Sequence, residues 1–588
     1  MPQDRFSLLL YRVCLLGSLL GLTATLYFLG GMSGHIGNPL LNVGTASVLV
    51  SGAIFFLYIF FLLLPDKSWV GFLIWVLILT VLLAEVVLGL VPPWARDELI
   101  HHLAMPKLYL QAGRIKEIPF ALHSYYPMLL DMLYTPFVKW GWDSIAKLIH
   151  GLFGFLTAIL LYAYLAHRLN PLYGLLGFLF FVSTPVVLKL GNLAYVDLGL
   201  TFYSTASLLC LLRWVEEVES KQWLILSGVS AGFALATKPN GLLVFLLLFF
   251  LLVFILERVG EGKTFTTIGW SVLFLFLAFI PFSPWFFKNL SQTGNPFFPS
   301  FISLFGGGGG GEPEVGILTR RQLLYGESWW QIAALPLRVF FSGQDNHPQY
   351  FDGVLNPILI LFLPWAFKGK WSVEKRLLFA FVLLYFLFSF FLVDLRIRYL
   401  LPIVPPLVLL LVYGIHNVYL RLVHPSLLFA VVLFLLAMNG VYLWGYFREV
   451  SPGDYLRGRE GRDAFLGRML PDYPAIQYIN RSLLLTARVY LLFMGRRGYH
   501  YERDYFYDAY DNPWILLHMI QGVQGEGDIK LKLRERGLTH LLIREDLLRS
   551  FLGTNLTSEE QALWGSFANH HLKRLFQARG YSVYEIHG

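Results

Sequence analysis

Two adjacent carboxylates and two adjacent histidines follow a long apolar run. Asp97 and Glu98 are succeeded by His101 and His102, and residues 70–91 before them are apolar apart from one glutamate. A carboxylate can take the proton of an attacking hydroxyl, whereas charges at the edge of the hydrocarbon are costly unless they face a cavity or a polar substrate. The segment is therefore either a site of proton transfer or, more simply, an interfacial helix whose first turn carries acids favoured by the helix dipole.

The positions of the histidines and cysteines do not indicate a metal site. On an α-helix, His101 and His102 diverge by about 100°, so they are not expected to face one site. The two cysteines, Cys14 and Cys210, both lie inside apolar runs, which excludes a disulfide framework and a cysteine-based metal site. The sequence implies no cofactor, and a divalent cation stays open.

The composition is that of a membrane protein. Of the 588 residues, 56% are hydrophobic and 14% are charged, whereas soluble domains carry about 25% charged residues. The net charge of +8 does not indicate nucleic acid binding, because Lys and Arg recur at the ends of apolar runs rather than in one patch.

About thirteen apolar runs are long enough to cross a bilayer, some only with local thinning. The first follows Arg5 and is interpreted as a retained signal-anchor span. The runs are residues 8–30, 43–64, 70–91, 144–166, 171–188, 195–214, 223–237, 242–256, 268–287, 354–367, 377–393, 399–420 and 426–444.

The positive-inside rule predicts an orientation with the N-terminus in the cytoplasm. It places Asp97 and the C-terminal segment outside, provided that residues 125–140, which contain Asp131 and two prolines, form a re-entrant or interfacial helix. An amphipathic interfacial helix is expected at residues 329–341. The predicted parts are three spans in 1–91, an external loop in 92–143, core spans in 144–287, an external loop with a mobile glycine-rich stretch from Gly306 in 288–353, further spans in 354–446, and an external domain in 447–588.

Five basic residues lie at the predicted outer ends of spans, on the same side as Asp97. Basic groups are disfavoured on that side, so a role such as anion binding is plausible for the group, although snorkelling is the simpler interpretation of any one of them. They are Lys189, Lys238, Lys288, Arg396 and Arg398.

The C-terminal segment predicts a small α/β domain outside the membrane. Strand-like runs occur at residues 489–493 and 540–543, and helical stretches at 475–484 and 528–536. The segment has no glycine-rich phosphate loop, which argues against nucleotide binding there.

Five stretches in this order resemble the GT-C superfamily of integral-membrane glycosyltransferases. The similarity is to its phospholipid-carrier-dependent group, which includes aminoarabinose transferases and protein O-mannosyltransferases. The stretches are RDELIHHLAMPKLYLQAGRI, LAYVDLGLTFYSTASL with Asp197, GFALATKPNGLLV with Lys238, PWFFKNLSQTGNPFFP with Lys288 and Asn289, and RIRYLLPIVPPLVLLL with Arg396, Arg398 and Tyr399.

The sequence departs from the family pattern at two places. Three predicted spans precede the acidic loop, where family members usually have one. The element after that loop runs from His123 to Pro127 and lacks the lysine that helps to hold the donor phosphate in some relatives.

The resemblance implies transfer of a sugar from a polyprenyl-phosphate donor to a lipid, glycan or protein acceptor by inverting displacement. It implies Asp97 as the base and Glu98 as a second acid, with Asp197, His101 and Asn289 in supporting roles. Cations would stabilise the departing phosphate. They and one tyrosine are Lys238, Lys288, Arg396, Arg398 and Tyr399. The expected fold is a GT-C membrane protein with a periplasmic C-terminal domain, in a bacterial inner membrane.

Two other classes of function remain open. A transporter or flippase of a lipid-linked or anionic substrate would also have many spans and a charged cavity, but such carriers often contain paired inverted repeats with broken helices near the midplane. No such repeat occurs, and the candidate charges lie at one predicted membrane face. A non-catalytic envelope scaffold is the third possibility.

Overall fold

The computed structural model describes residues 5–64, 68–217, 220–259, 264–302, 304–305, 317–368, 371–392, 395–422, 426–509 and 513–587. The chain forms two compact units. The first, here the helical unit, comprises Met1–Val91, Gly113–Ile115 and Tyr126–Pro452, and the second, here the sheet unit, comprises Pro92–Ala112, Lys116–Tyr125 and Gly453–Gly588.

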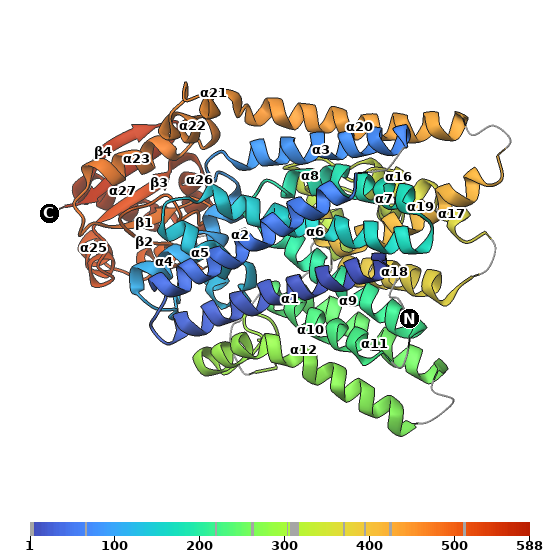
Figure 1. Ribbon diagram of the computed structural model, residues 1–588. Coiled ribbons are helices and arrows are strands. Elements are labelled where there is room, and N and C mark those ends of the chain that lie inside the picture. Colours follow the sequence, from blue (N-terminus) through green and yellow to red (C-terminus); the bar gives the residue numbers. More distant parts are fainter. Residues whose placement is uncertain are drawn as a thin grey trace. The chain divides into compact units, whose positions relative to one another are not determined.

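Eight described helices of the helical unit are long and apolar enough to cross a membrane. Figure 1 shows these long helices running roughly along one direction, with α20 beside α3. They confirm the predicted polytopic helical fold. The eight are α1 (Arg5–Met32), α2 (Pro39–Leu62), α3 (Trp69–Gly89), α6 (Ser144–Arg168), α9 (Asp197–Glu216), α12 (Thr264–Thr293), the continuous η4 (Ile397–Ile403) and α19 (Val404–Tyr419), and α20 (Ser426–Val450).

The number of crossings expected from the sequence, about thirteen, is not confirmed, and two of the predicted runs are broken into shorter helices. Proline accounts for two of the breaks, since it lacks the N–H that continues a helix. Pro185 begins a new helix within residues 171–188, and Pro364 does so within residues 354–367. The broken runs form α7 (Pro171–Ser183), α8 (Pro185–Leu190), α16 (Ile358–Leu361) and α17 (Leu363–Ala366), and the other helices of the unit's predicted runs are α10 (Lys221–Thr237), α11 (Gly241–Val259) and α18 (Val373–Leu392).

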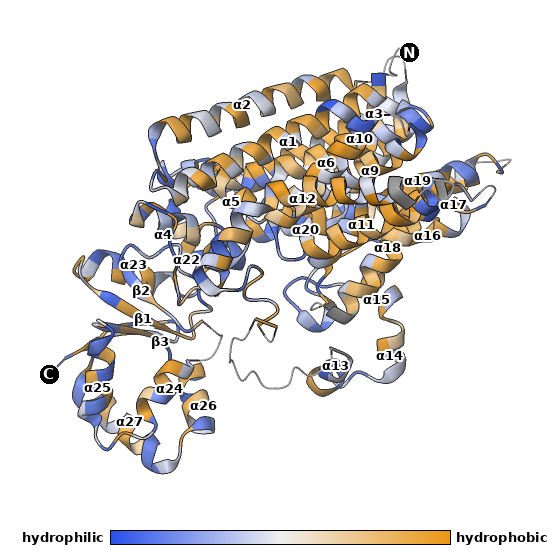
Figure 2. Cartoon of the chain, turned by 90° about the horizontal axis from the view of Figure 1, so that it is seen from below, coloured by the Kyte–Doolittle hydropathy of each residue, from blue (hydrophilic) through white to orange (hydrophobic). Residues whose placement is uncertain are grey.

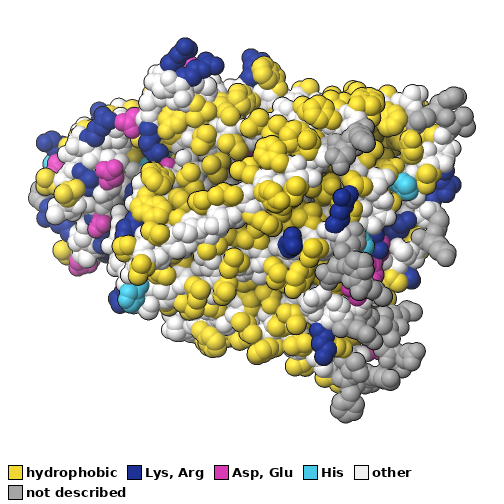
Figure 3. Space-filling view, viewed as in Figure 1, with side chains coloured by type: hydrophobic (Ala, Val, Ile, Leu, Met, Phe, Trp, Pro, Cys, Tyr) yellow, Lys and Arg dark blue, Asp and Glu magenta, His cyan; other side chains and the backbone are white. Residues whose placement is uncertain are grey.

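Helices α6, α9 and α19 form the centre of the helical unit, and α2, α3, α12 and α20 are its most exposed spans. Apolar side chains cover most of the helical unit on the face shown in Figure 3, and apolar residues dominate its long helices in Figure 2. Glycine permits close packing at the centre: a Cβ on Gly151 of α6 would lie 2.4 Å from the carbonyl oxygen of Gly191. The backbone leading into α9 therefore lies directly against α6.

Two further predicted elements are shorter than a span. Helix α5 (Leu129–Lys139) occupies the stretch expected to be re-entrant, and it has 11 residues. The helix expected at residues 329–341 is divided into α14 (Trp329–Ala333) and α15 (Leu335–Phe341), with Pro336 in the first turn of the second. Helices α13 (Ile317–Tyr325) and η3 (Pro348–Tyr350) flank them. The stretch from Gly306 that was expected to be mobile lies outside the described residues.

The sheet unit contains a five-stranded sheet in the order β2-β1-β3-β5-β4, which confirms the predicted α/β domain. Strand β1 is parallel to β2 and β3, whereas β5 is antiparallel to β3 and β4. The strands are β1 (Arg488–Leu492), β2 (Asp504–Phe506), β3 (His540–Arg544), β4 (Leu572–Ala578) and β5 (Tyr581–Ile586). The helices after residue 452 are α21 (Gly453–Leu456), α22 (Arg462–Met469), α23 (Tyr473–Ser482), α24 (Trp514–Ile520), α25 (Glu526–Glu535), α26 (Glu545–Asn555) and α27 (Ser558–His571).

The segment that carries Asp97 belongs to the sheet unit. It contains η1 (Glu98–His102), α4 (Ala104–Ala112) and η2 (Leu122–Tyr125). The Lys107 ammonium donates to the carbonyl oxygens of Tyr499 and Tyr501, both at 2.8 Å. The Leu99 carbonyl accepts from the N–H groups of Gly498 and Tyr499. Backbone hydrogen bonds thus join two segments that are far apart in the sequence.

A buried ion triad holds the segment between α12 and α16. Glu327 accepts from the guanidinium groups of Arg321, at 2.7 and 2.8 Å, and of Arg338, at 3.0 Å. Burial by itself would raise the pKa of Glu327, but these hydrogen bonds lower it below its usual value. Arg321 also donates to the carbonyl oxygen of Gln349. One carboxylate therefore fixes α13, α15 and the turn at Gln349 together.

Breaking this triad should loosen the segment locally. Arg321→Gln leaves Glu327 buried with one cation, which typically costs about 3 kcal/mol, so amide hydrogen exchange of residues 321–349 should accelerate about a hundredfold. The control Arg320→Gln changes the neighbouring exposed arginine and should leave exchange as in the wild type. Because the folded pKa of Glu327 is lowered, its contribution is present above its unfolded pKa, about 4.3, and is lost as the pH falls through the folded value. Equal exchange in both variants would contradict the triad's role.

Candidate functional site

Asp197 is the first residue of α9, where its carboxylate meets the positive end of the helix dipole. Its side chain is 3% exposed. His150, on α6, fixes the approach to this helix: its Nε2 accepts from the Leu198 N–H at 2.9 Å, and its Nδ1 donates to the carbonyl oxygens of Leu190 and Leu193 at 2.9 and 2.8 Å. These partners require a neutral imidazole protonated on Nδ1. His150 therefore positions the backbone that presents Asp197.

Lys238 meets Asp197 at the end of α10. It is the capping residue of that helix, it has an extended backbone, and Pro239 follows it and prevents continuation of the helix. Its ammonium lies 2.7 Å from Asp197 Oδ1. The start of one central helix and the end of its neighbour are thus joined by a mostly buried ion pair.

Arg398 and Tyr399 complete this group from η4. The Lys238 ammonium lies 4.6 Å from the centre of the Tyr399 ring, and the Arg398 guanidinium lies 5.0 Å from the same ring and 5.4 Å from that of Tyr195. Arg398 also donates to the Tyr399 hydroxyl at 3.3 Å, and Tyr385, on α18, donates to the Tyr399 carbonyl oxygen at 3.1 Å. We call Asp197, Lys238, Arg398, Tyr399 and Tyr195 the cation cluster.

The cation cluster can hold an anion. It combines two cations with one carboxylate, and its aromatic rings stack on the cations and leave hydrogen-bond donors at their edges. A phosphate group needs such a set: a planar guanidinium for two parallel hydrogen bonds, an ammonium, and a hydroxyl.

The other candidate residues of the helical unit have separate surroundings. Arg396 pairs with Asp352 at 3.6 Å, and Lys189 pairs with Asp345 at 2.8 Å. Lys288 is buried near the end of α12. The next residue, Asn289, donates to the carbonyl oxygen of Phe298 at 3.3 Å and so holds the turn that follows the helix.

Glu98 has a structural role in the sheet unit. It is fully buried, and its Oε2 accepts from the backbone N–H groups of Trp94 and Ala95 at 2.9 and 2.8 Å. Asp97 is half-buried and caps η1, a single π-helical turn. Such turns frequently occur at functional sites. Glu98 thus shapes the backbone that presents its neighbour Asp97.

The expectation that His101 and His102 diverge is wrong. Their ring centroids lie 3.9 Å apart, and the His101 ring also stacks on His123 at 4.5 Å. Residues 98–102 form a π-turn rather than the expected α-helix. Within the described residues, no group of three or more His, Cys, Asp or Glu side chains has an arrangement that could hold a metal ion.

Three residues around the cation cluster were not identified from the sequence. They are His150, Tyr195 and Tyr385. For His150 a signal existed, because a histidine in the middle of a long apolar run must find polar partners. The tyrosines carry no such signal, since tyrosine is common at the ends of membrane spans.

Residues 143–290 match the model of the dolichyl-phosphate-mannose-protein mannosyltransferase family, and that segment includes Asp197, Lys238 and Lys288. No curated protein sequence matches the chain.

Solved structures show which fold the chain has. ArnT from Cupriavidus metallidurans bound to undecaprenyl phosphate is 15% identical with a TM-score of 0.52, over 88% of this chain and 98% of that chain. The apo state of the same ArnT has the same identity and TM-score, and the match covers 87% of this chain and 97% of that chain. The archaeal oligosaccharyltransferase AglB from Archaeoglobus fulgidus, in complex with an inhibitory peptide and a dolichol-phosphate, is 12% identical with a TM-score of 0.43, over 81% and 70%. The similarity to ArnT extends over nearly the whole of both chains.

The ion pair of the cation cluster can be tested by a double-mutant cycle. Asp197→Asn leaves a buried ammonium without its carboxylate, so it should destabilise the protein by about 3 kcal/mol, and Lys238→Met should act similarly. The loss of stability in the double variant should be smaller than the sum of the losses in the two single variants. Thermal unfolding of the detergent-solubilised protein measures these changes.

The control for this cycle is Lys189→Met. It removes a partly exposed pair, and we expect a loss below about 1 kcal/mol. Strictly additive losses in the double variant would show that Asp197 and Lys238 do not stabilise each other.

Proposed function

We propose that this protein, a glycosyltransferase of the GT-C type, moves a sugar from a polyprenyl-phosphate-linked donor to an acceptor outside the cytoplasm. The observation that carries the proposal is the cation cluster, which supplies the donors that a phosphate group needs. The ArnT structure of the same fold binds undecaprenyl phosphate, which supports the same carrier class here. A bacterial inner membrane, with the C-terminal domain in the periplasm, fits the distribution of Lys and Arg along the chain.

The cluster would act on the leaving group. In the transition state the bond from the anomeric carbon to the phosphate oxygen breaks, and the electron pair stays on the phosphate. Cations that are already in place stabilise this developing charge without reorganising. Arg398 would bind two phosphate oxygens, Tyr399 would donate its hydroxyl to a third, and Lys238, oriented by Asp197, would lie beside them. Lys288, Arg396 and Asn289 remain candidates for further contacts with the donor.

Asp97 would act on the nucleophile. The acceptor hydroxyl attacks the anomeric carbon from the side opposite the phosphate, which inverts that centre, and its proton passes to the Asp97 carboxylate. Asp97 suits this role better than Glu98, because it is half-buried whereas an oxygen of Glu98 is already bound by two backbone N–H groups. Glu98 would then position its neighbour, and His101, beside it on the π-turn, would support the same backbone. The acceptor is a lipid, a glycan or a protein.

Replacing the proposed base should stop turnover without unfolding the protein. Asp97→Asn keeps the size of the side chain but cannot take a proton, so we expect release of free polyprenyl phosphate from polyprenyl-phosphate sugars to fall by about 10²- to 10⁴-fold. Lipid mass spectrometry after reaction of the reconstituted enzyme with a panel of such donors measures this release. The unfolding temperature should stay as in the wild type.

Glu98→Gln is the matched control for Asp97→Asn. It weakens two charge-assisted hydrogen bonds, so it should lower the unfolding temperature, and its turnover should exceed that of Asp97→Asn. If Asp97→Asn keeps full turnover, Asp97 is not the base. If the wild-type protein moves the donors across the bilayer of a liposome without cleaving them, it is a carrier rather than a transferase.

The two arginines near η4 should differ in their effect on the donor. Arg398→Gln removes a guanidinium of the cation cluster, so we expect kcat/KM for the donor to fall by about 10²-fold or more. Arg396→Gln removes a guanidinium that pairs with Asp352, and it should cost less than about tenfold. Steady-state kinetics in the assay described above distinguish them. Equal losses would argue against the cation cluster as the phosphate site.

A further inference from the structure

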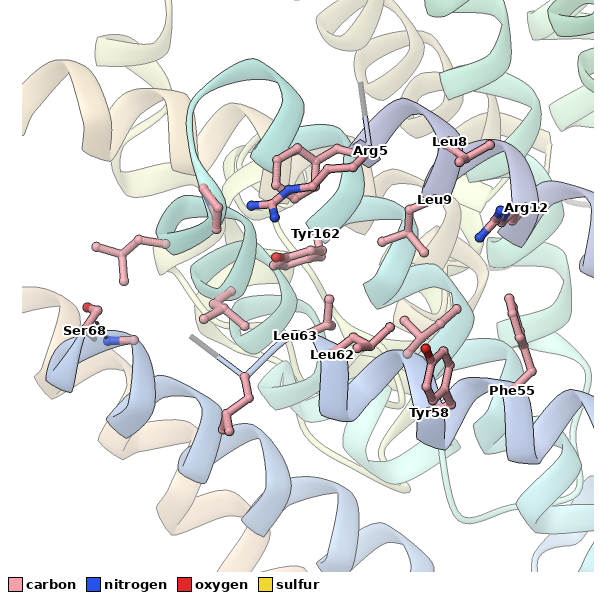
Figure 4. Close-up of a pocket in the computed structure, with 17 residues that line it drawn as sticks. Arg5, Leu8, Leu9, Arg12, Phe55, Tyr58, Leu62, Leu63, Ser68 and Tyr162 are labelled. Carbon is pink, nitrogen blue, oxygen red and sulfur yellow. Dashed lines mark hydrogen bonds between the residues drawn. The ribbon is translucent and has the colours of Figure 1, made fainter. Parts of the chain in front are cut away.

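A cavity lies at the helix ends where α1 begins. It has a volume of about 610 Å³ and lies between α1, the end of α2, the start of α3, α6 and the start of α7. Figure 4 shows Arg5, Leu8, Leu9 and Arg12 from α1 around it, with Tyr58 from α2 and Tyr162 from α6. It shares no residue with the cation cluster.

One face of α1 presents two arginines to this cavity. Arg5 and Arg12 are seven residues apart, which is two helical turns or about 10 Å, and Leu8 and Leu9 lie between them on the same face. Both arginines are exposed. The Arg5 guanidinium lies 4.7 Å from the centre of the Phe6 ring, and neither arginine forms a salt bridge with a residue that the structure describes.

Other arginines at these helix ends have carboxylate partners. Arg213 binds Glu216 and Glu217 at 2.5 and 2.6 Å, and it also donates to the Ser7 hydroxyl, which places it at the start of α1. Arg168 pairs with Glu216 and with Glu374. Arg5 and Arg12 differ from these: both line the cavity, and among the described residues neither pairs with a carboxylate.

The remaining walls of the cavity are mostly aliphatic. They include Leu62 and Leu63 from α2 and Leu172 and Leu175 from α7, and the Tyr58 hydroxyl adds a polar group. Guanidinium groups bind phosphate through paired hydrogen bonds, and aliphatic walls suit hydrocarbon chains. A free phosphate ion would gain nothing from the aliphatic walls, whereas a lipid with a charged phosphate headgroup matches both parts.

We propose that this cavity binds an anionic phospholipid. Its phosphate lies on Arg5 and Arg12, and the upper part of its acyl chains lies along the leucines of α1, α2 and α7. Arg5 is in the first turn of a helix that is long and apolar enough to cross a membrane, and long basic side chains at the ends of such helices reach toward the lipid headgroups. The positive-inside rule predicts the cytoplasmic leaflet, whose anionic lipids attract basic residues. The site is independent of the proposed transfer reaction.

The test compares lipid retention by charge-matched variants. The full-length protein is reconstituted in nanodiscs with equal amounts of phosphatidylglycerol and phosphatidylcholine, and native mass spectrometry measures the phosphatidylglycerol that stays bound after transfer to detergent. Arg5→Gln/Arg12→Gln should reduce retention by roughly fivefold or more per arginine removed. The control Arg376→Gln/Arg421→Gln removes two exposed arginines at the ends of α18 and α19, outside the cavity, and should retain the lipid.

Further measurements separate the cavity from general surface charge. Leu9→Trp keeps both arginines and fills the space between them, so it should also lose the lipid, and Arg5→Lys/Arg12→Lys should retain part of it. Unfolding temperatures verify that each variant is folded. The proposal is overturned if Leu9→Trp retains phosphatidylglycerol as the wild type does, if the control pair loses as much as Arg5→Gln/Arg12→Gln, or if inorganic phosphate displaces the lipid.

Discussion

The ion pair between Asp197 and Lys238 is the contact on which the arrangement of the helical unit's candidate site depends. It joins the first residue of α9 to the residue that ends α10, so it fixes where two central helices meet. A buried carboxylate without a cation would be strongly unfavourable there, and so would a buried ammonium without a carboxylate. The pair also sets the position of the Lys238 ammonium over the Tyr399 ring, and it thereby brings η4 to the same place.

Hydrogen bonds from a neutral histidine hold the backbone next to this charged pair. His150 binds three backbone groups around the turn into α9, and the absence of a side chain at Gly151 lets that turn approach α6. The turn is buried, so its backbone groups need hydrogen bonds from other protein groups. A neutral histidine supplies them without adding a second buried charge. The position of Asp197 is therefore set by residues behind it, which would not themselves touch a substrate.

Much of the fold could be predicted from the sequence because apolar runs and strand patterns are local signals. Lys238 was predicted to lie at the outer end of a span, and Asp197 was expected to support the site. Contacts that depend on distant backbone were not foreseen: Lys107 binds carbonyl groups at Tyr499 and Tyr501, and nothing near either segment signals the other. Nor could an α-helical template place His101 beside His102, because a π-turn is set by packing and not by composition.

The basic residues illustrate why a count of charges is a weaker guide than a list of their partners. The sequence grouped five outer cations as one candidate anion site. In the structure Lys189 and Arg396 pair with Asp345 and Asp352, whereas Lys238, which pairs with Asp197, and Arg398 converge on one tyrosine ring. Arg5, at the start of α1, is the opposite case. Its sequence position indicated only the orientation of the first span, but in the structure it lines a cavity with mostly apolar walls. The surroundings of each cation, which its position in the sequence does not reveal, therefore decide which of these residues can share one ligand.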